Sequence, residues 1–229
     1  MIRAALAGAA CLVASAAGAV ECRLALVLAM DVSSSVDARE DALQRGGLAA
    51  ALTAPEVEAA FFASPLPVAL ADYEWSGRNQ QSLLLDWTLI RAPDDLRRAA
   101  AVIGGSMRGH EEFPTAMGYA LGYGATLLTR GPGCLFSTID IAGDGRNNAG
   151  FGPEQAYREF PFAGVTVNGL VVNGADFEGE IDLIDFYSRE VLHGPGAFLE
   201  VAQGFEDYER AMTRKLLREL LNRAVSMAD

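Results

Sequence analysis

The chain has 229 residues, of which 30 are acidic and 18 are lysine or arginine, so its formal net charge is −12. A surface this negative repels phosphate backbones, which argues against nucleic acid as a partner. Hydrophobic residues make up 51% of the chain, and because no internal repeat or composition break is visible, we expect a single α/β domain over residues 20–229.

The amino terminus predicts export. Residues 1–3 carry one positive charge, residues 4–17 are mostly small and apolar, and residues 17–19 (Ala-Gly-Ala) fit the small-x-small pattern of a signal-peptidase site. We therefore predict a signal peptide over residues 1–19 and a mature protein in the periplasm or outside the cell. Lipidation at Cys11 or Cys22 is a weaker alternative, because neither follows a good Leu-containing lipobox. The apolar stretch is too short for a membrane span, and no later uncharged stretch reaches its length, so no membrane span is expected.

In the first half, apolar runs alternate with helical patterns. The run Leu24–Met30 is continuous rather than alternating, which predicts a strand buried on both faces of a parallel sheet. Helices are expected at Asp37–Thr53 and, shorter, at Pro55–Phe62. The next two strands, Pro67–Trp75 and Gln81–Trp87, are too close in sequence for a parallel crossover, so they must form an antiparallel hairpin.

The second half returns to alternating helices and strands. Helices are predicted at Ala92–Ile103, Pro114–Leu128, Pro153–Phe160 and Tyr208–Val225, and strands at Cys134–Ile141, Val165–Val172 and Phe198–Ala202. This order predicts a doubly wound α/β fold with a mostly parallel central sheet, one antiparallel strand and helices on both faces. The charged stripe of the closing helix is expected to face solvent. It contains Arg214, Lys215, Arg218 and Glu219.

Hard oxygen donors follow the first predicted strand. The segment Asp31-Val32-Ser33-Ser34-Ser35 places a carboxylate and alternate hydroxyls in one loop, and Mg²⁺ and Mn²⁺ prefer such ligands. The motif therefore predicts metal binding. Helix capping and turn formation by Asp and Ser are the alternative interpretation.

Two other loops reach the same edge of the predicted sheet. In doubly wound folds, ligands bind at the carboxyl ends of the strands, near the point where the strand order reverses. Asp144 follows a predicted strand, and Thr115 opens a predicted helix after a long loop, so both can face Asp31. Asn147 and Asn148 come directly after Asp144, and they either orient it by hydrogen bonds or simply form the turn.

These three motifs, in this order, resemble the von Willebrand factor A domain superfamily. Its metal-ion-dependent adhesion site (MIDAS) is built from Asp-x-Ser-x-Ser, a threonine from a second loop and an aspartate from a third. The segments Asp31–Asp37 and Gly143–Asn148 look more specifically like a branch of uncharacterised secreted bacterial members. The resemblance extends from about Leu24 to Leu220. It implies that hydroxyls bind the metal directly, that acids bind it directly or through water, and that one position stays open for a partner's oxygen. The implied metal ligands are Asp31, Ser33, Ser35, Thr115 and Asp144.

The resemblance implies a non-catalytic binding module that holds a protein or glycan partner through Mg²⁺ or Mn²⁺, with Ca²⁺ as a further option. A metal-dependent hydrolase of the phosphatase or esterase kind is the alternative, because a hydrated divalent ion can activate water. Binding is favoured since the chain has no Ser/His/Asp order, no Gly-x-Ser-x-Gly and no Cys/His pair. Thr115 departs from the family pattern, because it follows Glu111 and Glu112 in a loop that is not glycine-rich. These two acids would repel an acidic partner.

Two cysteines remain after the predicted signal peptide. Cys22 lies nine residues before Asp31, and Cys134 lies ten residues before Asp144, so both are expected at the edge of the sheet opposite the predicted metal site. The resemblance places their strands side by side and so implies a Cys22–Cys134 disulfide in an oxidising compartment. Two buried free thiols are the alternative.

Overall fold

The structure is a computed structural model that describes residues 20–174 and 182–225. Its centre is a six-stranded sheet with the order β3-β2-β1-β4-β5-β6, in which β3 pairs antiparallel and the other pairs are parallel. This arrangement confirms the predicted doubly wound, mostly parallel fold. The predicted signal peptide lies outside the described residues. The strands are β1 (Cys22–Asp31), β2 (Val68–Trp75), β3 (Gln81–Ile90), β4 (Cys134–Gly143), β5 (Val165–Val172) and β6 (Leu199–Ala202).

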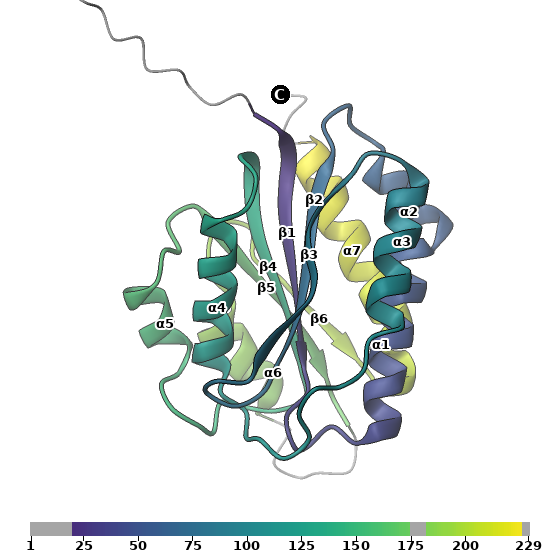
Figure 1. Ribbon diagram of the computed structural model, residues 1–229. Coiled ribbons are helices and arrows are strands. Elements are labelled where there is room, and N and C mark those ends of the chain that lie inside the picture. The colour runs from purple at the N-terminus through teal and green to yellow at the C-terminus, as the bar shows by residue number, and fades with distance from the viewer. Residues whose placement is uncertain (1–19, 175–181, 226–229) are drawn as a thin grey trace, which may run out of the picture.

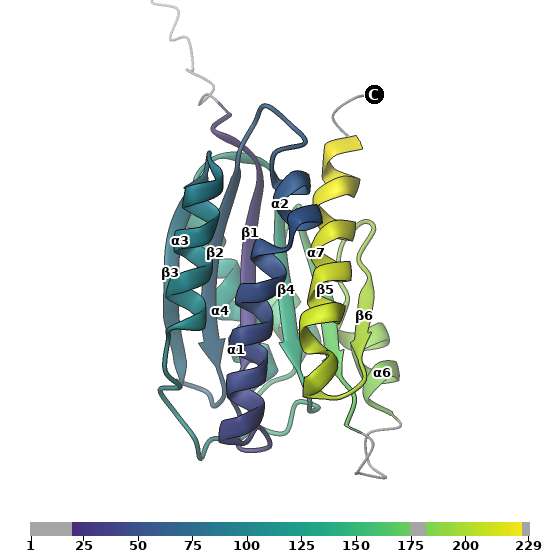
Figure 2. The same cartoon turned by 90° about the vertical axis from the view of Figure 1, so that its right-hand side faces the viewer.

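Helices cover both faces of the sheet (Figure 1). Figure 2 shows α3, α1 and α7 side by side on one face. That layer consists of α1 (Ala38–Thr53), α2 (Pro55–Phe61), α3 (Pro93–Gly104) and α7 (Tyr208–Val225), which the short 3₁₀ helix η3 (Phe205–Asp207) precedes. The other layer consists of α4 (Met117–Thr129), α5 (Pro153–Glu159), α6 (Leu183–Phe186) and the π-helix η2 (Tyr187–Val191). α6 and η2 are not among the predicted elements. Within the described residues, no helix combines the length and the apolar character that crossing a membrane requires.

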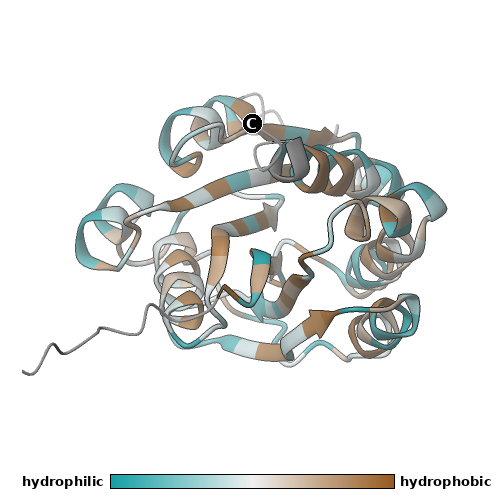
Figure 3. Ribbon diagram, turned by 90° about the horizontal axis from the view of Figure 1, so that it is seen from above, coloured by the Kyte–Doolittle hydropathy of each residue, from teal (hydrophilic) through white to brown (hydrophobic). Residues whose placement is uncertain are grey.

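β1 is buried on both faces, which explains its continuous apolar sequence. Leu24, Leu26 and Leu28 belong to the core beneath α1 and α7, whereas Val27 and Ala29 belong to the core beneath α4. Figure 3 shows the strands between the two helix layers. Because side chains alternate between the faces of a strand, only a run without polar interruptions can serve both cores.

The two central strands place the predicted metal motifs at the end of the sheet where the parallel strands have their carboxyl ends. β1 pairs with β2 on one side and with β4 on the other, and from these central strands the chain winds outward in opposite directions. The strand order therefore reverses between β1 and β4, where doubly wound folds bind ligands. Asp31 is the last residue of β1, and Asp144 directly follows the last residue of β4.

α1 begins just after the loop that follows β1. Asp37 caps it by accepting hydrogen bonds from the backbone of Arg39 and Glu40, and the Glu40 side chain accepts from the Asp37 backbone N–H. This capping box fixes the direction in which the chain leaves the loop. Gly47 does not interrupt the helix. A Cβ there would lie 3.0 Å from the backbone nitrogen of Glu209, so the glycine allows α7 to approach α1 closely.

At the opposite edge of the sheet, Cys22 and Cys134 are register partners and form a disulfide with a Cα–Cα distance of 4.5 Å. The predicted pairing is confirmed, and the alternative of two free thiols is wrong. The bond joins residues 112 positions apart, and closing so long a loop contributes about 5 kcal/mol in the chain-entropy account. It ties together the starts of the two strands whose ends carry the candidate site.

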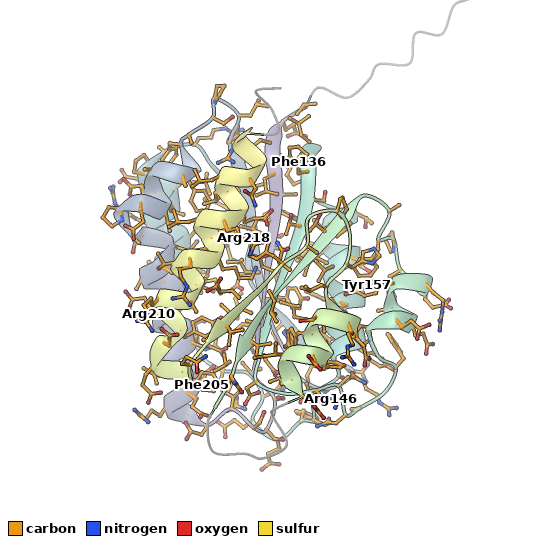
Figure 4. The ribbon with its side chains drawn as sticks, turned by 180° about the vertical axis from the view of Figure 1, so that it is seen from behind. Phe136, Arg146, Tyr157, Phe205, Arg210 and Arg218 are labelled. Atoms are coloured by element: carbon orange, nitrogen blue, oxygen red, sulfur yellow. A yellow bond between two sulfur atoms is a disulfide. The ribbon has the colours of Figure 1, made fainter. Side chains whose placement is uncertain are left out.

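The predicted solvent face of α7 is partly wrong. Arg214 and Arg218 are exposed, as expected, and Figure 4 labels Arg218 on this helix, but Lys215 and Glu219 are buried. Lys215 Nζ lies 2.5 Å from Asp140 Oδ1 on β4, and Glu219 accepts hydrogen bonds from side chains of β4 and β5. Helical periodicity cannot reveal this arrangement, because the sheet beneath the helix supplies the partners.

Candidate metal centre

Asp31 stabilises the turn with which the loop after β1 begins. Its Oδ1 accepts a hydrogen bond from the Ser33 backbone N–H at 2.8 Å, which is a turn that Asp commonly stabilises. The Oγ atoms of Ser33 and Ser35 lie 3.2 Å apart, so the alternate hydroxyls are on one side of the loop. Asp31 and Ser33 are buried and Ser35 is exposed. The row of oxygen donors therefore runs from the core to the surface.

Thr115 and Asp144 extend this row. Thr115 Oγ1 donates to Ser33 Oγ at 3.2 Å, and Ser35 Oγ donates to Asp144 Oδ1 at 2.8 Å. The five predicted residues thus form one hydrogen-bonded group between the ends of β1 and β4. Thr115 itself lies in the loop before α4, because that helix begins at Met117 rather than at the predicted position.

Asn148 joins the two loops that carry Thr115 and Asp144. Its Oδ1 accepts from the Thr115 N–H at 2.9 Å, and its own N–H donates to the Thr115 carbonyl at 2.9 Å. The Asn148 side chain therefore holds the backbone of Thr115, whereas the sequence interpretation expected it to orient Asp144. Asn147 Oδ1 is buried and has no hydrogen-bond partner among the residues that the structure describes.

Arg108 holds the loop after β1 by hydrogen bonds, and no sequence motif identifies this arginine. Its guanidinium donates to the carbonyls of Val32, Ser33 and Val36 at 2.6–2.9 Å and to the His110 carbonyl at 2.7 Å. These bonds join the loop before α4 to the loop after β1. Spacing rules miss such a residue, because most of its partners are backbone atoms far away in the sequence.

The two acids of the group are buried together. Asp31 is 0% exposed and Asp144 is 8% exposed, and Asp31 Oδ2 has no hydrogen-bond partner in the described part of the chain. Burial raises the pKa of Asp31 well above its usual range, and the nearby Asp144 raises it further. Burial also raises the pKa of Asp144. A bound cation would reverse this penalty, because it favours the charged form of both carboxyls.

The donor set fits a hard divalent cation. Two carboxylates and three hydroxyls offer oxygen ligands whose combined charge a divalent ion can neutralise. Residues 20–174 and 182–225 contain no group of three or more His, Cys, Asp or Glu side chains that could hold a metal ion. A metal at this position would therefore depend on the hydroxyls of Ser33, Ser35 and Thr115.

A cavity of 790 Å³ lies beside this group. Ser35, Thr115 and Asp144 contribute to one part of its wall, and Arg146 and Phe205 contribute to others. Figure 4 labels Arg146 and Phe205 toward the lower end of the sheet, where the parallel strands end. This volume is typical of sites that enclose a small molecule or a short segment of a partner.

The charge around the cavity is mixed. Arg39 and Arg146 line it together with Glu40 and Glu206, and Arg39 forms an exposed ion pair with Glu206 at 2.7 Å. The acids Glu111 and Glu112, which the sequence places just before Thr115, are exposed and are not among the lining residues. The two acids are therefore not part of the cavity wall itself.

The fold is that of a von Willebrand factor A domain. Similar solved structures include proximal thread matrix protein 1 from the mussel byssus with a zinc-occupied MIDAS motif, at 15% identity and a TM-score of 0.58 over 88% of this chain and 48% of that chain. The von Willebrand factor type A protein from Catenulispora acidiphila gives 15% identity and a TM-score of 0.57 over 89% of this chain and 43% of that chain. The PilB minor pilin from Streptococcus sanguinis gives 12% identity and a TM-score of 0.58 over 89% of this chain and 62% of that chain.

This chain spans about half the length of the mussel protein and less of the Catenulispora protein. At such identities the likeness establishes the fold alone. No curated protein matches the sequence. Residues 21–224 match the family described as "Protein of unknown function (DUF1194)". Because this match covers most of the chain, the protein belongs to the DUF1194 family.

Proposed function

We propose that this protein is an exported, non-enzymatic binding module that holds a divalent cation at its MIDAS-type group and uses it to bind an oxygen-bearing group of a protein or glycan partner. The observation that carries the proposal is the meeting of three loops in one hydrogen-bonded group of five oxygen-bearing side chains. The proposed ligands are Asp31, Ser33, Ser35, Thr115 and Asp144. Mg²⁺ or Mn²⁺ is the proposed ion, with Ca²⁺ less suited to short hydroxyl donors.

The neutral ligands matter for partner binding. Two carboxylates balance the charge of a divalent ion, and the three hydroxyls add no further negative charge. The ion would therefore stay electrophilic enough to accept one more oxygen from a partner, as octahedral coordination requires. The adjacent cavity of 790 Å³ offers room for the group that carries this oxygen. The zinc-occupied MIDAS motif of the mussel protein supports a divalent ion in general.

Export is the second part of the proposal. The sequence predicts a signal peptide over residues 1–19, and the Cys22–Cys134 disulfide suits an oxidising compartment such as the periplasm or the exterior of the cell. Similar structures include a pilus adhesin and a minor pilin, which supports a role at or beyond the cell surface. Mass spectrometry of the protein exported by a bacterial host tests this part. An amino terminus at Val20 is expected, and intracellular, uncleaved protein would contradict it.

Metal binding is tested by titrating the mature protein with Mn²⁺ in a calorimeter. Wild type should bind one ion, and Thr115→Val should weaken the affinity tenfold or more, about 1.4 kcal/mol, because it removes one hydroxyl without changing the shape of the side chain. Thr126→Val is the matched control, since its hydroxyl donates to the Gly122 carbonyl inside α4. Absence of Mn²⁺ binding, or equal affinities for wild type and Thr115→Val, would contradict the proposed site.

Partner binding is tested by attaching wild type or the Thr115→Val variant to a solid support. Proteins and glycans of the exported fraction should be retained by wild type with Mg²⁺, released by a chelator, and not retained by Thr115→Val. A screen of phosphate and ester substrates at saturating Mg²⁺ and Mn²⁺ tests the other function class. If the protein shows metal-dependent turnover and Thr115→Val abolishes it, the protein is a hydrolase and the proposal of a binding module is wrong.

A further inference from the structure

Tyr187 points its hydroxyl from the helix layer toward the candidate metal centre. It is the first residue of the π-helix η2, and its carbonyl accepts from the Leu192 N–H at 2.9 Å. Its side chain is fully buried. Single π-helical turns are rare and frequently lie at functional sites.

Two glycines on neighbouring strands make room for the Tyr187 ring. A Cβ on Gly169 of β5 would lie 2.8 Å from Tyr187 Cδ1, and a Cβ on Gly143 of β4 would lie 2.7 Å from Tyr187 Oη. Any larger residue at either position would therefore displace the ring. The ring lies against the sheet, with its hydroxyl at the end of β4, one residue before Asp144.

The same point beside Gly143 is also close to Asp31. A Cβ on Gly143 would lie 2.8 Å from Asp31 Oδ2 and 2.7 Å from Tyr187 Oη, so the carboxylate oxygen and the phenol oxygen lie close to the same point. Both atoms are buried, and neither has a hydrogen-bond partner among the described residues. A buried donor and a buried acceptor that lack partners and converge in this way are suited to each other.

We propose that Tyr187 is a positioning residue of the metal centre, whose hydroxyl donates a hydrogen bond to Asp31 Oδ2, directly or through one water molecule. The inference rests on the proposed metal site. Asp31 Oδ1 is already held by the Ser33 N–H at 2.8 Å, so a second hydrogen bond on Oδ2 fixes the plane of the carboxylate. Carboxylate oxygens have more than one acceptor position, and Asp31 therefore keeps capacity for the metal or for a water bound to it.

The phenol is suited to this task because it remains a donor. A tyrosine hydroxyl, whose usual pKa is about 10, keeps its proton at neutral pH. Groups that orient metal ligands by hydrogen bonds typically change metal affinity about 10- to 100-fold when they are removed. Tyr187→Phe removes the donor and keeps the ring between Gly143 and Gly169.

The test compares Tyr187→Phe with Tyr73→Phe in the mature protein. Tyr73 is equally buried, but its Oη donates to the Ala120 carbonyl at 2.7 Å. Calorimetric titration with Mn²⁺ should show an affinity about 10- to 100-fold lower for Tyr187→Phe and unchanged for Tyr73→Phe. Melting in the presence of a chelator checks that both variants fold, and Tyr73→Phe should lower the melting temperature, because it removes the hydrogen bond to the Ala120 carbonyl.

A Tyr187→Phe protein that binds Mn²⁺ within about twofold of wild type would overturn the positioning role and leave the proposed metal site intact. Loss of metal-free melting temperature without loss of affinity would also overturn it, since that pattern indicates a purely structural hydroxyl. If wild type itself binds no Mn²⁺, the proposed function and this inference are both wrong.

Discussion

Asp140 lies on β4 and Asp144 directly follows that strand, yet the two acids have different kinds of neighbours. Asp140 is 3% exposed, and its Oδ1 lies 2.5 Å from Lys215 Nζ. Asp144 is almost as buried, at 8% exposed, but accepts its hydrogen bond from the Ser35 hydroxyl and has Asp31 nearby. The first acid has a cation of the protein as its direct partner, whereas the second accepts from a neutral hydroxyl and has both Asp31 and the Arg108 guanidinium nearby.

This difference separates an acid that the protein itself pairs with a cation from an acid of the proposed metal site. A buried acid next to a lysine of the same chain needs no ion from solvent, although burying both charges has a cost. Buried acids among hydroxyls gain most from an ion supplied from outside, which stabilises the folded state by mass action. We call the two groups the ion-pair cluster (Thr138, Asp140, Asn168, Lys215 and Glu219) and the metal rim, which is the set of proposed metal ligands (Asp31, Ser33, Ser35, Thr115 and Asp144).

The largest effect is expected from removing the cation of the ion-pair cluster. Lys215→Met leaves Asp140 and Glu219 buried without it, and breaking a buried ion pair from one side typically costs about 3–5 kcal/mol. Denaturant unfolding should show this loss, while the folded protein keeps the Mn²⁺ affinity of wild type. Arg218→Met is the control, because Arg218 is exposed over the Phe198 ring and should contribute about 1 kcal/mol or less. Equal stability of Lys215→Met and wild type would show that the cluster is not a stabilising ion pair.

Asp72 is a buried acid of a third kind, and it should make stability depend on pH. Neither of its oxygens has a hydrogen-bond partner in the described residues, and Arg45 is bound to Asp41 and Glu74 instead. Burial raises the pKa of Asp72 to about 7, with Glu74 adding to the rise and Arg45 opposing it.

Between about pH 4 and pH 7, the folded protein holds a proton on Asp72 that the unfolded chain has released, so this group lowers stability as the pH rises. Asp72→Asn should remove that part of the pH dependence, so its stability relative to wild type should rise by on the order of 4 kcal/mol from pH 4 to pH 8. Unfolding free energies of both proteins at the two pH values, with a chelator present, measure the difference. A constant difference between the two proteins would contradict the shifted pKa.

The metal rim should respond in the opposite direction to the ion-pair cluster when a charge is removed. Asp31→Asn keeps the acceptor for the Ser33 N–H but deletes a buried negative charge, so the metal-free protein should become more stable by about 1–2 kcal/mol. With saturating Mn²⁺ the order should reverse, because only wild type gains stability from the ion. Melting curves with and without Mn²⁺ measure both effects. A metal-free Asp31→Asn protein less stable than wild type would show that Asp31 is a structural acid.

The smallest effect is expected at an exposed acid away from both groups. Asp86 lies on the antiparallel strand β3 and pairs with Arg130 at 2.9 Å on the surface. Asp86→Asn should change stability by about 0.5 kcal/mol or less and leave Mn²⁺ affinity unchanged. A tenfold loss of affinity, about 1.4 kcal/mol, would mean that charges outside the metal rim contribute to the binding of the ion.

The comparison also separates what could be predicted from what could not. The continuous apolar run of β1 predicts a strand buried on both faces, and the short link between β2 and β3 predicts the antiparallel pair. The positions of Cys22 and Cys134 relative to the acids predict the edge at which both lie. The fold class and the five rim residues therefore follow from local patterns and from the resemblance that those patterns carry. These are statements about spacing within one element or about the ends of elements.

The tertiary structure alone decided the partners of individual side chains. Lys215 lies three residues before the exposed Arg218, so the two are less than one helical turn apart. Only the packing of α7 on β4 places Lys215 beside Asp140. Arg108 and Tyr187 belong to no recognisable motif, because their partners are carbonyls and glycines from distant parts of the chain. Apolar periodicity predicts the approximate buried face of an element, but in α7 it assigned the buried Lys215 and Glu219 to solvent, because it cannot show what that face meets. That depends on how the layers pack, and it determines whether a buried acid has a lysine or a hydroxyl as its direct partner.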